Sequence, residues 1–336
     1  MDIDHNNERS LDRLANTLKS GHMVLFITGA GLSVASGIST YRSETTSIWS
    51  NFIYEWGTRK KFYEDPLVWY NKFWLRTHEK IEYFQAKPNE GHHAIARLSH
   101  RCKIKVVTQN IDRLHVKTSL LESNLVEVHG RLGLYKCVNT GDLHKKGRKK
   151  KNPINTVCPY AIDKNICTID ITKYEPKQGT NFEDGSLEIQ EVPRCPGCND
   201  PALPQALLFD EKYTSHDFYQ WHRVLNWIQS FSFQPVRSAA VVFIGTSFSV
   251  GVTQEAVLVC AAQGKDMYNF NVRVEDEVSE LKDMYHIIGK ADVMIPMLDK
   301  KLVNNNNRPR MYYHPTSDEC MDVQMEYMDK VEPYVD

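Results

Sequence analysis

The chain has 336 residues, with 41 lysines and arginines against 42 aspartates and glutamates, 13 histidines, 8 cysteines and a hydrophobic content of 41%. This composition is that of an ordinary globular protein, and the length allows one large elaborated domain or two modest ones. A formal net charge of -1 excludes a protein that is basic throughout, although a local basic patch fits within that total. No run approaches 18 apolar residues, so we expect no membrane-spanning helix.

The first ten residues are polar and acidic, which argues against a secretory signal and against an arginine-rich transit peptide. We therefore expect a nuclear or cytoplasmic protein. Disulfides are rare in these reducing compartments, so a cluster of cysteines there is first interpreted as metal ligands or redox groups.

Leucines at 11, 14 and 18 predict a first helix, and the apolar run at 23–27 predicts a buried strand after it. Further strands are expected at 104–108, 125–128, 239–244 and 268–272, and helices at 91–99 and 253–262. Strands that alternate with helices predict an α/β fold with a doubly wound parallel sheet. Such a sheet binds its ligand at the carboxyl ends of its strands.

Two stretches interrupt this alternation. Residues 44–90 are rich in aromatic side chains and lack strand patterning, which predicts a helical module around a satellite core. Residues 134–200 are polar and lysine-rich and include five cysteines, which predicts a second inserted module. The expected division is a large domain made of 1–43, 91–133 and 201–300, the modules at 44–90 and 134–200, and a C-terminal tail at 301–336.

Small residues follow the first strand, at 29–37. They would let backbone amides and a helix N-terminus approach a phosphate, but glycine could equally serve a tight strand-to-helix turn. The usual dinucleotide fingerprint fails, because Val34 stands at its third glycine position and residues 47–50 offer no carboxylate for a ribose hydroxyl. A dinucleotide at this loop would therefore be bound in a non-dehydrogenase manner.

Three more groups of small or polar residues follow strands. Residues 108–112 end in two amides and a carboxylate, suited to a ribose or an amide ligand, although Asp112 could simply cap the next helix. His129 is followed by Gly130, which would let a ligand come close, yet a lone histidine is more often structural. Residues 245–247 suit ribose or phosphate. All four groups are expected to meet in one crevice.

In this order the motifs resemble the sirtuins, the silent information regulator family of NAD-dependent protein deacylases. The resemblance covers about residues 10–300. The matching segments are GAGLSVASGISTYR at 29–42, TQNID at 108–112, HG at 129–130, CPGC at 195–198, LPQALLFDE at 203–211, GTSFSV at 245–250 and Asn271.

The resemblance implies a reaction that consumes NAD and yields nicotinamide, O-acyl-ADP-ribose and free lysine. The acyl oxygen of an acyl-lysine attacks the ribose carbon that bears nicotinamide, and His129 would then act as general base on a ribose hydroxyl. Asn110 and Asp112 would position the ribose and the departing nicotinamide. The implied cofactor-binding residues are Gly29, Ala30, Gly31, Ser33, Ser36, Thr40, Tyr41, Arg42, Gln109, Asn110, Ile111, Asp112, His129, Gly245, Thr246, Ser247, Asn271 and Ala291.

The implied substrate is an acyl-lysine protein or peptide, such as a histone, which would pair as an added strand with residues 207–211. The residues of that strand are Leu207, Leu208, Phe209, Asp210 and Glu211. Asp210 departs from the family, which usually has glycine there.

Two other departures concern the nicotinamide and the acyl group. Thr40 replaces the usual aspartate, which weakens a nicotinamide contact of the main deacetylase branch but resembles the bacterial and desuccinylase-like branches. The desuccinylase-like branch also carries Tyr-x-x-Arg, where this chain has Phe73 and Arg76. Arg76 could pair with an acyl carboxylate, although Phe73 lacks the hydroxyl that would share it. The alternative is that Phe73 belongs to the core and Arg76 is merely solvated.

The spacing of CPGC at 195–198 is that of half a zinc site. Cys137 matches the family's first ligand, but Thr140 stands where the second is expected. We expect Cys158 to replace it, with Cys167 as the alternative. A structural zinc bound by Cys137, Cys158, Cys195 and Cys198 is therefore favoured over a metal-free module. The predicted fold is a Rossmann-like sheet with a smaller inserted domain made of a helical and a zinc-binding module.

The insert also contains a basic run at 145–151, with six cationic residues in seven. It could be a nuclear import signal, a nucleic-acid contact or a solvated loop. Two other functions remain open for the whole chain. One is an NAD hydrolase or ADP-ribosyltransferase with the same pocket, which would need neither zinc nor a substrate strand. The other is a non-catalytic, chromatin-associated scaffold, against which the intact His129, Asn110 and Asp112 argue.

Overall fold

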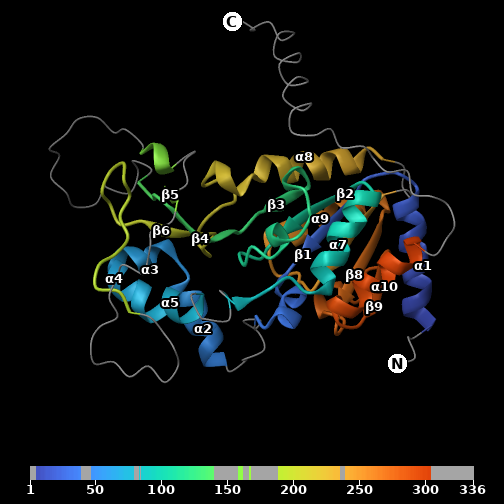
Figure 1. Cartoon of the computed structure of the whole chain (residues 1–336), viewed down its shortest axis with the longest axis horizontal. Helices are drawn as coiled ribbons and strands as arrows, with labels where there is room; N and C mark the ends of the chain where they lie inside the picture. The colour runs from blue at the N-terminus through green and yellow to red at the C-terminus, as the bar shows by residue number, and fades with distance from the viewer. Residues whose placement is uncertain are drawn as a thin grey trace, which may run out of the picture.

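The computed structural model of the chain describes residues 5–38, 47–78, 83, 85–139, 158–161, 166–167, 188–234 and 239–303. These residues form a large α/β domain with a smaller domain beside it (Figure 1). Thr40, Tyr41 and Arg42, the basic run at 145–151 and most of the expected tail lie outside the described residues. No helix in the described part has the length and apolarity that a bilayer crossing requires.

The large domain is built on a parallel sheet, for which the described residues supply six strands in the order β3-β2-β1-β7-β8-β9. The strands are β1 (Val24–Thr28), β2 (Ile104–Thr108), β3 (Leu125–Glu127), β7 (Ala240–Ile244), β8 (Asp266–Asn271) and β9 (Met284–Ile288). The chain runs outward from β1 in one direction and from β7 in the other, so the strand order reverses between these two strands, which is where such sheets bind their ligands. The predicted doubly wound sheet is confirmed, and β9 is a strand that the sequence did not predict.

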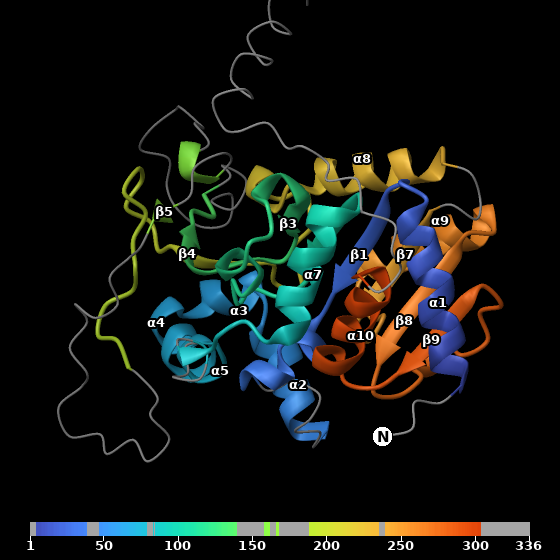
Figure 2. The ribbon, with the colours of Figure 1, turned by 45° about the vertical axis from the view of Figure 1, so that its right-hand side comes forward.

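Helices cover both faces of this sheet (Figure 2). The helices are α1 (His5–Lys19), α7 (Glu90–Arg101) and α10 (Ala291–Val303) on one face, and α8 (Trp221–Ser232) and α9 (Gly251–Gln263) on the other. Successive side chains of a strand point to opposite faces. Phe26 accordingly packs with the first set of helices, and Leu25 and Ile27 with the second. Every residue of β1 is buried for this reason.

Local signals set the ends of several helices. The Asn89 side chain accepts hydrogen bonds from the amides of Gly91 and His92 and so caps α7. At the other end of a helix, Gly264 adopts φ 59° and terminates α9 in a left-handed turn. The expected helices at 91–99 and 253–262, which were predicted from their residue patterns, agree with α7 and α9 within a few residues.

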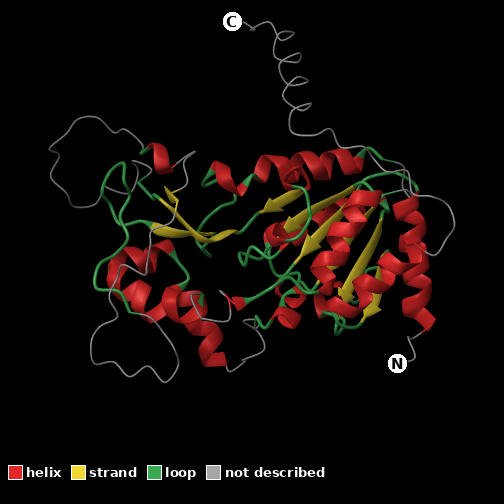
Figure 3. Cartoon of the chain, in the orientation of Figure 1, coloured by secondary structure: helices red, strands yellow, loops and turns green. Residues whose placement is uncertain are grey.

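The small domain combines the two inserted modules around one core (Figure 3). Its helical elements are α2 (Ser47–Trp56), α3 (Arg59–Glu64), α4 (Pro66–Trp69), a π-helical turn (Tyr70–Trp74) and α5 (Leu75–Thr77). Its antiparallel sheet has the order β5-β4-β6, with β4 (Gly130–Lys136), β5 (Ile166–Cys167) and β6 (Leu203–Ala206). The Tyr70 hydroxyl donates to the Ala202 carbonyl at 2.7 Å and joins the two modules. The small sheet, which begins at Gly130 and ends at Ala206, extends a few residues beyond both ends of the expected module at 134–200.

Candidate active site

A cavity of about 1020 Å³ lies at the carboxyl ends of the large sheet and extends to the small domain. Ligand sites of small molecules typically occupy about 300–1,000 Å³, so this cavity could hold a large one. The predicted cofactor-binding residues that line it are Gly29, Ala30, Gly31, Ser33, Gln109, Asn110, Ile111, Asp112, His129, Gly245, Thr246, Ser247, Asn271 and Ala291. Ser36 is not in the lining, and its hydroxyl instead accepts a hydrogen bond from Asn89 Nδ2 at 3.0 Å.

One wall of the cavity is formed by the loops after β1 and β7, which meet backbone to backbone. The Gly31 amide donates to the Gly245 carbonyl at 2.9 Å. A Cβ atom on Gly31 would lie 2.6 Å from Gly245 Cα, and one on Gly245 would lie 2.5 Å from the Leu32 nitrogen. Backbone packing therefore requires both glycines, and it leaves this wall free of bulky side chains.

Asp112 joins the loop after β1 to the loop after β2. Ser33 Oγ donates to Asp112 Oδ2 at 2.6 Å, and Asn110 Nδ2 donates to Ser33 Oγ at 3.1 Å and to the Gly29 carbonyl at 3.0 Å. The other carboxylate oxygen accepts from the Leu114 amide at 2.9 Å. Burial raises the pKa of the Asp112 carboxyl, and the bond from Ser33 opposes that shift. Asp112 thus holds a backbone turn and also lines the cavity.

A second polar group lies at the β7 and β8 side of the cavity. Gln109 Nε2 is 3.2 Å from Thr246 Oγ1, and Asn271 Nδ2 donates to the Thr246 carbonyl at 3.0 Å. Residues from three strand ends therefore meet, as the sequence predicted from their positions after strands.

His129 lies where the large domain meets the small one. Burial lowers the pKa of its imidazole to about 4, and a hydrogen bond with the backbone of Gln109 acts in the opposite direction. The ring is therefore neutral at physiological pH and has one nitrogen that can accept a proton. Its Nε2 lies 3.2 Å from the Tyr213 hydroxyl, a residue that no sequence motif indicated.

Gly130 has a different role from the one expected. Its φ is +100°, and the position of a Cβ atom there is already occupied by the backbone of Gln205. The close approach of β4 and β6 therefore accounts for this glycine, which does not line the cavity.

The predicted substrate segment, 207–211, is fastened to both domains. Leu207, Leu208, Phe209 and Glu211 line the cavity. The Leu207 amide donates to the His129 carbonyl at 2.8 Å and the Phe209 amide to the Gly57 carbonyl at 2.9 Å. Asp210 is not in the lining. Its carboxylate accepts from the backbone amides of Arg59 and Lys60 at 2.7 and 3.0 Å, at the start of α3.

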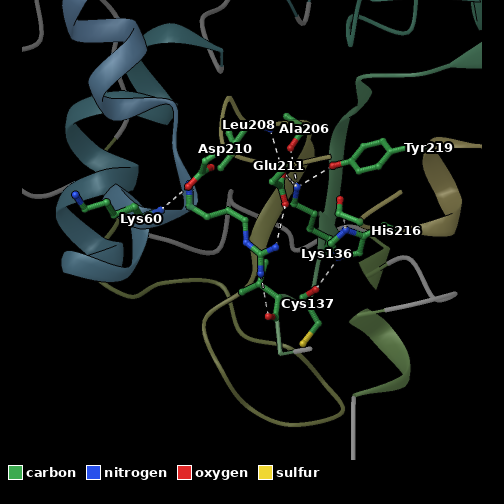
Figure 4. A network of polar contacts seen from close by, with 12 residues as sticks. Lys60, Lys136, Cys137, Ala206, Leu208, Asp210, Glu211, His216 and Tyr219 are labelled. Atoms are coloured by element: carbon green, nitrogen blue, oxygen red, sulfur yellow. Dashed lines mark hydrogen bonds and ion pairs between the residues drawn. The ribbon is translucent and has the colours of Figure 1, made fainter. Parts of the chain in front are cut away.

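A buried polar network holds the segment 207–211 in place (Figure 4). Lys136 and Glu211 form an ion pair in which both side chains are fully buried. Lys136 Nζ also donates to the Ala206 carbonyl and to the Tyr219 hydroxyl, each at 2.7 Å. Burial lowers the pKa of Lys136, and the neighbouring Glu211 carboxylate opposes that shift. Sequence reasoning missed this lysine, although a cation inside an otherwise apolar stretch was a signal.

The end of the cavity in the small domain is aromatic. Phe73 and Trp74 are buried and line it, and the ring of His78 stacks on Trp74 with centroids 4.1 Å apart. Burial lowers the pKa of His78 to about 3. Arg76 is exposed and absent from the lining, and its Nε donates to the Asn71 carbonyl at 3.1 Å. Phe73 is thus buried, as in the alternative, but Arg76 is more than solvated, because its guanidinium also lies 4.0 Å from the Glu188 carboxylate.

The structure brings together the cysteines 137, 158, 195 and 198, whose sulfur atoms all lie within 4.8 Å of one another. The Sγ atoms of Cys137 and Cys198 are 3.5 Å apart, and those of Cys158 and Cys195 are 3.7 Å apart. Four thiolates at about 2.3 Å from a tetrahedral zinc ion would be about 3.8 Å apart, so the set fits zinc. Cys167 lies in β5, where its backbone pairs with Leu134, and its side chain is outside the described part.

The chain was compared with known proteins. The model of the Sir2 family matches residues 29–251. NAD-dependent deacetylase sir2E of Dictyostelium discoideum is 44% identical over 315 residues, which cover 92% of this chain and 84% of that protein. An NAD-dependent protein deacylase of Candida albicans is 27% identical over 319 residues, which cover 88% and 99% of the two chains.

Solved structures show the same fold. A Sir2 homologue in complex with NAD superposes with a TM-score of 0.60 at 20% identity, covering 87% of this chain and 93% of that one. The family model spans most of the large domain and all of the small one, and the Dictyostelium relative extends the match over nearly the whole chain. The chain therefore belongs to the Sir2 family.

Proposed function

We propose that this chain is an NAD-dependent protein-lysine deacylase that releases nicotinamide and forms O-acyl-ADP-ribose and free lysine. The observation that carries the proposal is the position of His129, a neutral imidazole that lines one cavity together with Asp112 and with four residues of the expected substrate strand, Leu207, Leu208, Phe209 and Glu211. The names of the Dictyostelium and Candida relatives, a deacetylase and a deacylase, support it.

The residues that line the cavity fit NAD. The wall formed by residues 29–31 and Gly245, which carries no bulky side chain, would admit the phosphates, and Ser247 and Asn271 would hold the adenosine side. NAD, when bound, would supply the ribose carbon from which nicotinamide leaves. Asp112 and Asn110 would orient that ribose and the nicotinamide amide.

His129 would act after nicotinamide has left. Because burial keeps the imidazole neutral, Nε2 can take the proton of a ribose hydroxyl. The acyl-lysine would lie beside residues 207–211, with its acyl group directed to the aromatic end of the cavity. A histone substrate, a nucleic-acid contact through residues 145–151 and a nuclear or cytoplasmic location stay predictions from the sequence.

The test is to incubate the protein with NAD and with peptides that carry acetyl-, succinyl- or longer acyl-lysine. We expect nicotinamide and deacylated peptide only when an acyl peptide is present, and His129→Ala should abolish deacylation without loss of folding. The control is His22→Ala, which removes a histidine outside the cavity lining.

Each other outcome has a defined meaning. Nicotinamide release without peptide would indicate an NAD hydrolase, and no release at all would indicate a scaffold. Full turnover by His129→Ala would overturn the role of His129 as the base.

A further inference from the structure

Tyr213 lies against the proposed base and has no role in the function described so far. Its hydroxyl is 3.2 Å from His129 Nε2, and the two rings are nearly parallel at 17° with centroids 5.8 Å apart. The phenol ring also stacks on Trp221, at 4.3 Å and 13°. Tyr213 is half-buried and lines the cavity, so the aromatic stack holds its hydroxyl at the site.

The neighbouring hydrogen bonds decide which way the Tyr213 hydroxyl points. The Val252 amide, in the first turn of α9, donates to the Tyr213 oxygen at 3.3 Å. A phenol oxygen that accepts from a backbone amide still has its own proton to donate. His129 Nε2, 3.2 Å away, is in place to accept that proton.

The protonation of the imidazole agrees with this direction. The bond between His129 and the backbone of Gln109 raises the pKa of His129, which is the effect of a ring N–H that donates to a carbonyl. We assign the ring proton to Nδ1, because Nε2 faces Tyr213 at 3.2 Å. In this tautomer the lone pair is on Nε2, directed at the phenol.

We propose that Tyr213 is a positioning residue for His129, one that contacts Nε2 in both protonation states of the base. In the resting enzyme the phenol donates to Nε2 and fixes the orientation of the ring. A ribose hydroxyl that approaches Nε2 replaces that bond, and the phenol proton turns away about its C–O bond. This inference rests on the proposed function.

The proton transfer explains why the protonated state of His129 also needs Tyr213. The ribose O–H bond breaks, an Nε2–H bond forms, and the imidazole becomes a cation. In a buried site this cation is disfavoured, unless the new N–H has an acceptor. The Tyr213 oxygen, already held by the Val252 amide, is in place to accept it, and no bond of tyrosine has to break.

The first experiment separates two chemical steps in Tyr213→Phe, which keeps the stacked ring and removes only the hydroxyl. Exchange of labelled nicotinamide into NAD, with acyl peptide present, depends on departure of nicotinamide, which precedes the action of His129. Formation of deacylated peptide depends on the base. We expect exchange within twofold of the unmodified protein and product formation lower by about tenfold, as for loss of a hydrogen bond to a charged group.

Tyr285→Phe is the matched control, because this tyrosine in β9 lies outside the lining of the cavity. It should change neither rate. If Tyr213→Phe lowers the rates of nicotinamide exchange and of product formation equally, Tyr213 has only a structural role. If it lowers neither rate, the proposed role of Tyr213 is overturned. An unmodified protein that is inactive with every peptide would instead contradict the proposed function.

The second experiment needs neither NAD nor turnover. In protein labelled with ¹⁵N-histidine, the His129 resonances are identified by their absence in His129→Ala. Tyr213→Phe should move the Nε2 resonance downfield, since a hydrogen bond to its lone pair is lost, and should leave Nδ1 unchanged. An unchanged Nε2 resonance would overturn the proposed contact.

Discussion

At the scale of single residues, the site depends on how closely two backbones approach. Both Gly31 and Gly245 face backbone atoms at less than 3 Å from a would-be Cβ, and Gly245 is in addition at φ 58°. By contrast, Gly264 has nearly the same φ, 59°, with no atom within 4 Å of a would-be Cβ. Comparing Gly245 with Gly264 therefore separates the free energy of backbone strain, which both would have with a side chain, from that of the close contact, which only Gly245 would have.

We predict that Gly245→Ala lowers the free energy of unfolding by about 3 kcal/mol, from left-handed backbone strain plus overpacking against Leu32. It should also weaken NAD binding, because the loop after β1 must move. Gly264→Ala should cost only about 1 kcal/mol and leave NAD binding unchanged. Urea unfolding and calorimetric titration with NAD measure both effects, and equal losses in the two variants would contradict the role of the contact.

At the scale of elements, a buried ion pair ties β4 to the substrate segment. Lys136 is the last residue of β4, and Glu211 ends the segment 207–211, where its carboxylate also accepts from the Leu208 amide at 2.9 Å. Arg59 of α3 lies 3.7 Å from the same carboxylate. The placement of the substrate segment therefore depends on charges that come from three elements.

We predict that Lys136→Met destabilises the protein by about 3–5 kcal/mol, because it leaves the Glu211 carboxylate buried without its main partner. The double variant Lys136→Met with Glu211→Gln should recover much of that loss, since a neutral amide can still accept from the Leu208 amide. A double-mutant cycle by urea unfolding measures the coupling. Strictly additive effects of the two changes would show that the pair is not coupled.

At the scale of the whole molecule, the small domain is completed by groups that are far apart in the chain. Its core contains Trp69 and Trp74 from the helical module together with Cys137, Cys158 and Cys195 from the other. Burial raises the pKa of the Cys158 thiol to about 11, so without a cation this sulfur would stay protonated. A bound metal ion would therefore stabilise the core that forms one wall of the active site.

We predict one zinc ion per chain, measured by elemental analysis. Cys158→Ser should lose the metal and lower the melting temperature, whereas Cys167→Ser should retain both. A strong chelator should lower the melting temperature of the unmodified protein and of Cys167→Ser alike. Loss of zinc in Cys167→Ser instead would show that the fourth ligand is Cys167 and not Cys158.

The strands β1, β2, β3, β7 and β8 and the polar groups that follow four of them could be predicted, because apolar runs and small-residue turns are local properties of the chain. The strand β9 was missed, because as an edge strand it is only partly buried and its pattern is weak. Arg76 illustrates another limit. Its spacing from Phe73 permitted a role in the cavity, but the fold directs its side chain to solvent.

The sequence by itself determined the family, the parallel sheet and the residues that gather at its carboxyl edge, since these follow from ordered motifs and periodicity. Only the tertiary structure decided which groups meet across the chain. Tyr213 and His129 are 84 positions apart, and the Lys136 and Glu211 pair is separated by 75. Neither pairing leaves a local pattern, because the partners meet only once distant segments have assembled, as when β4 pairs with β6 and brings Lys136 next to the segment that follows β6.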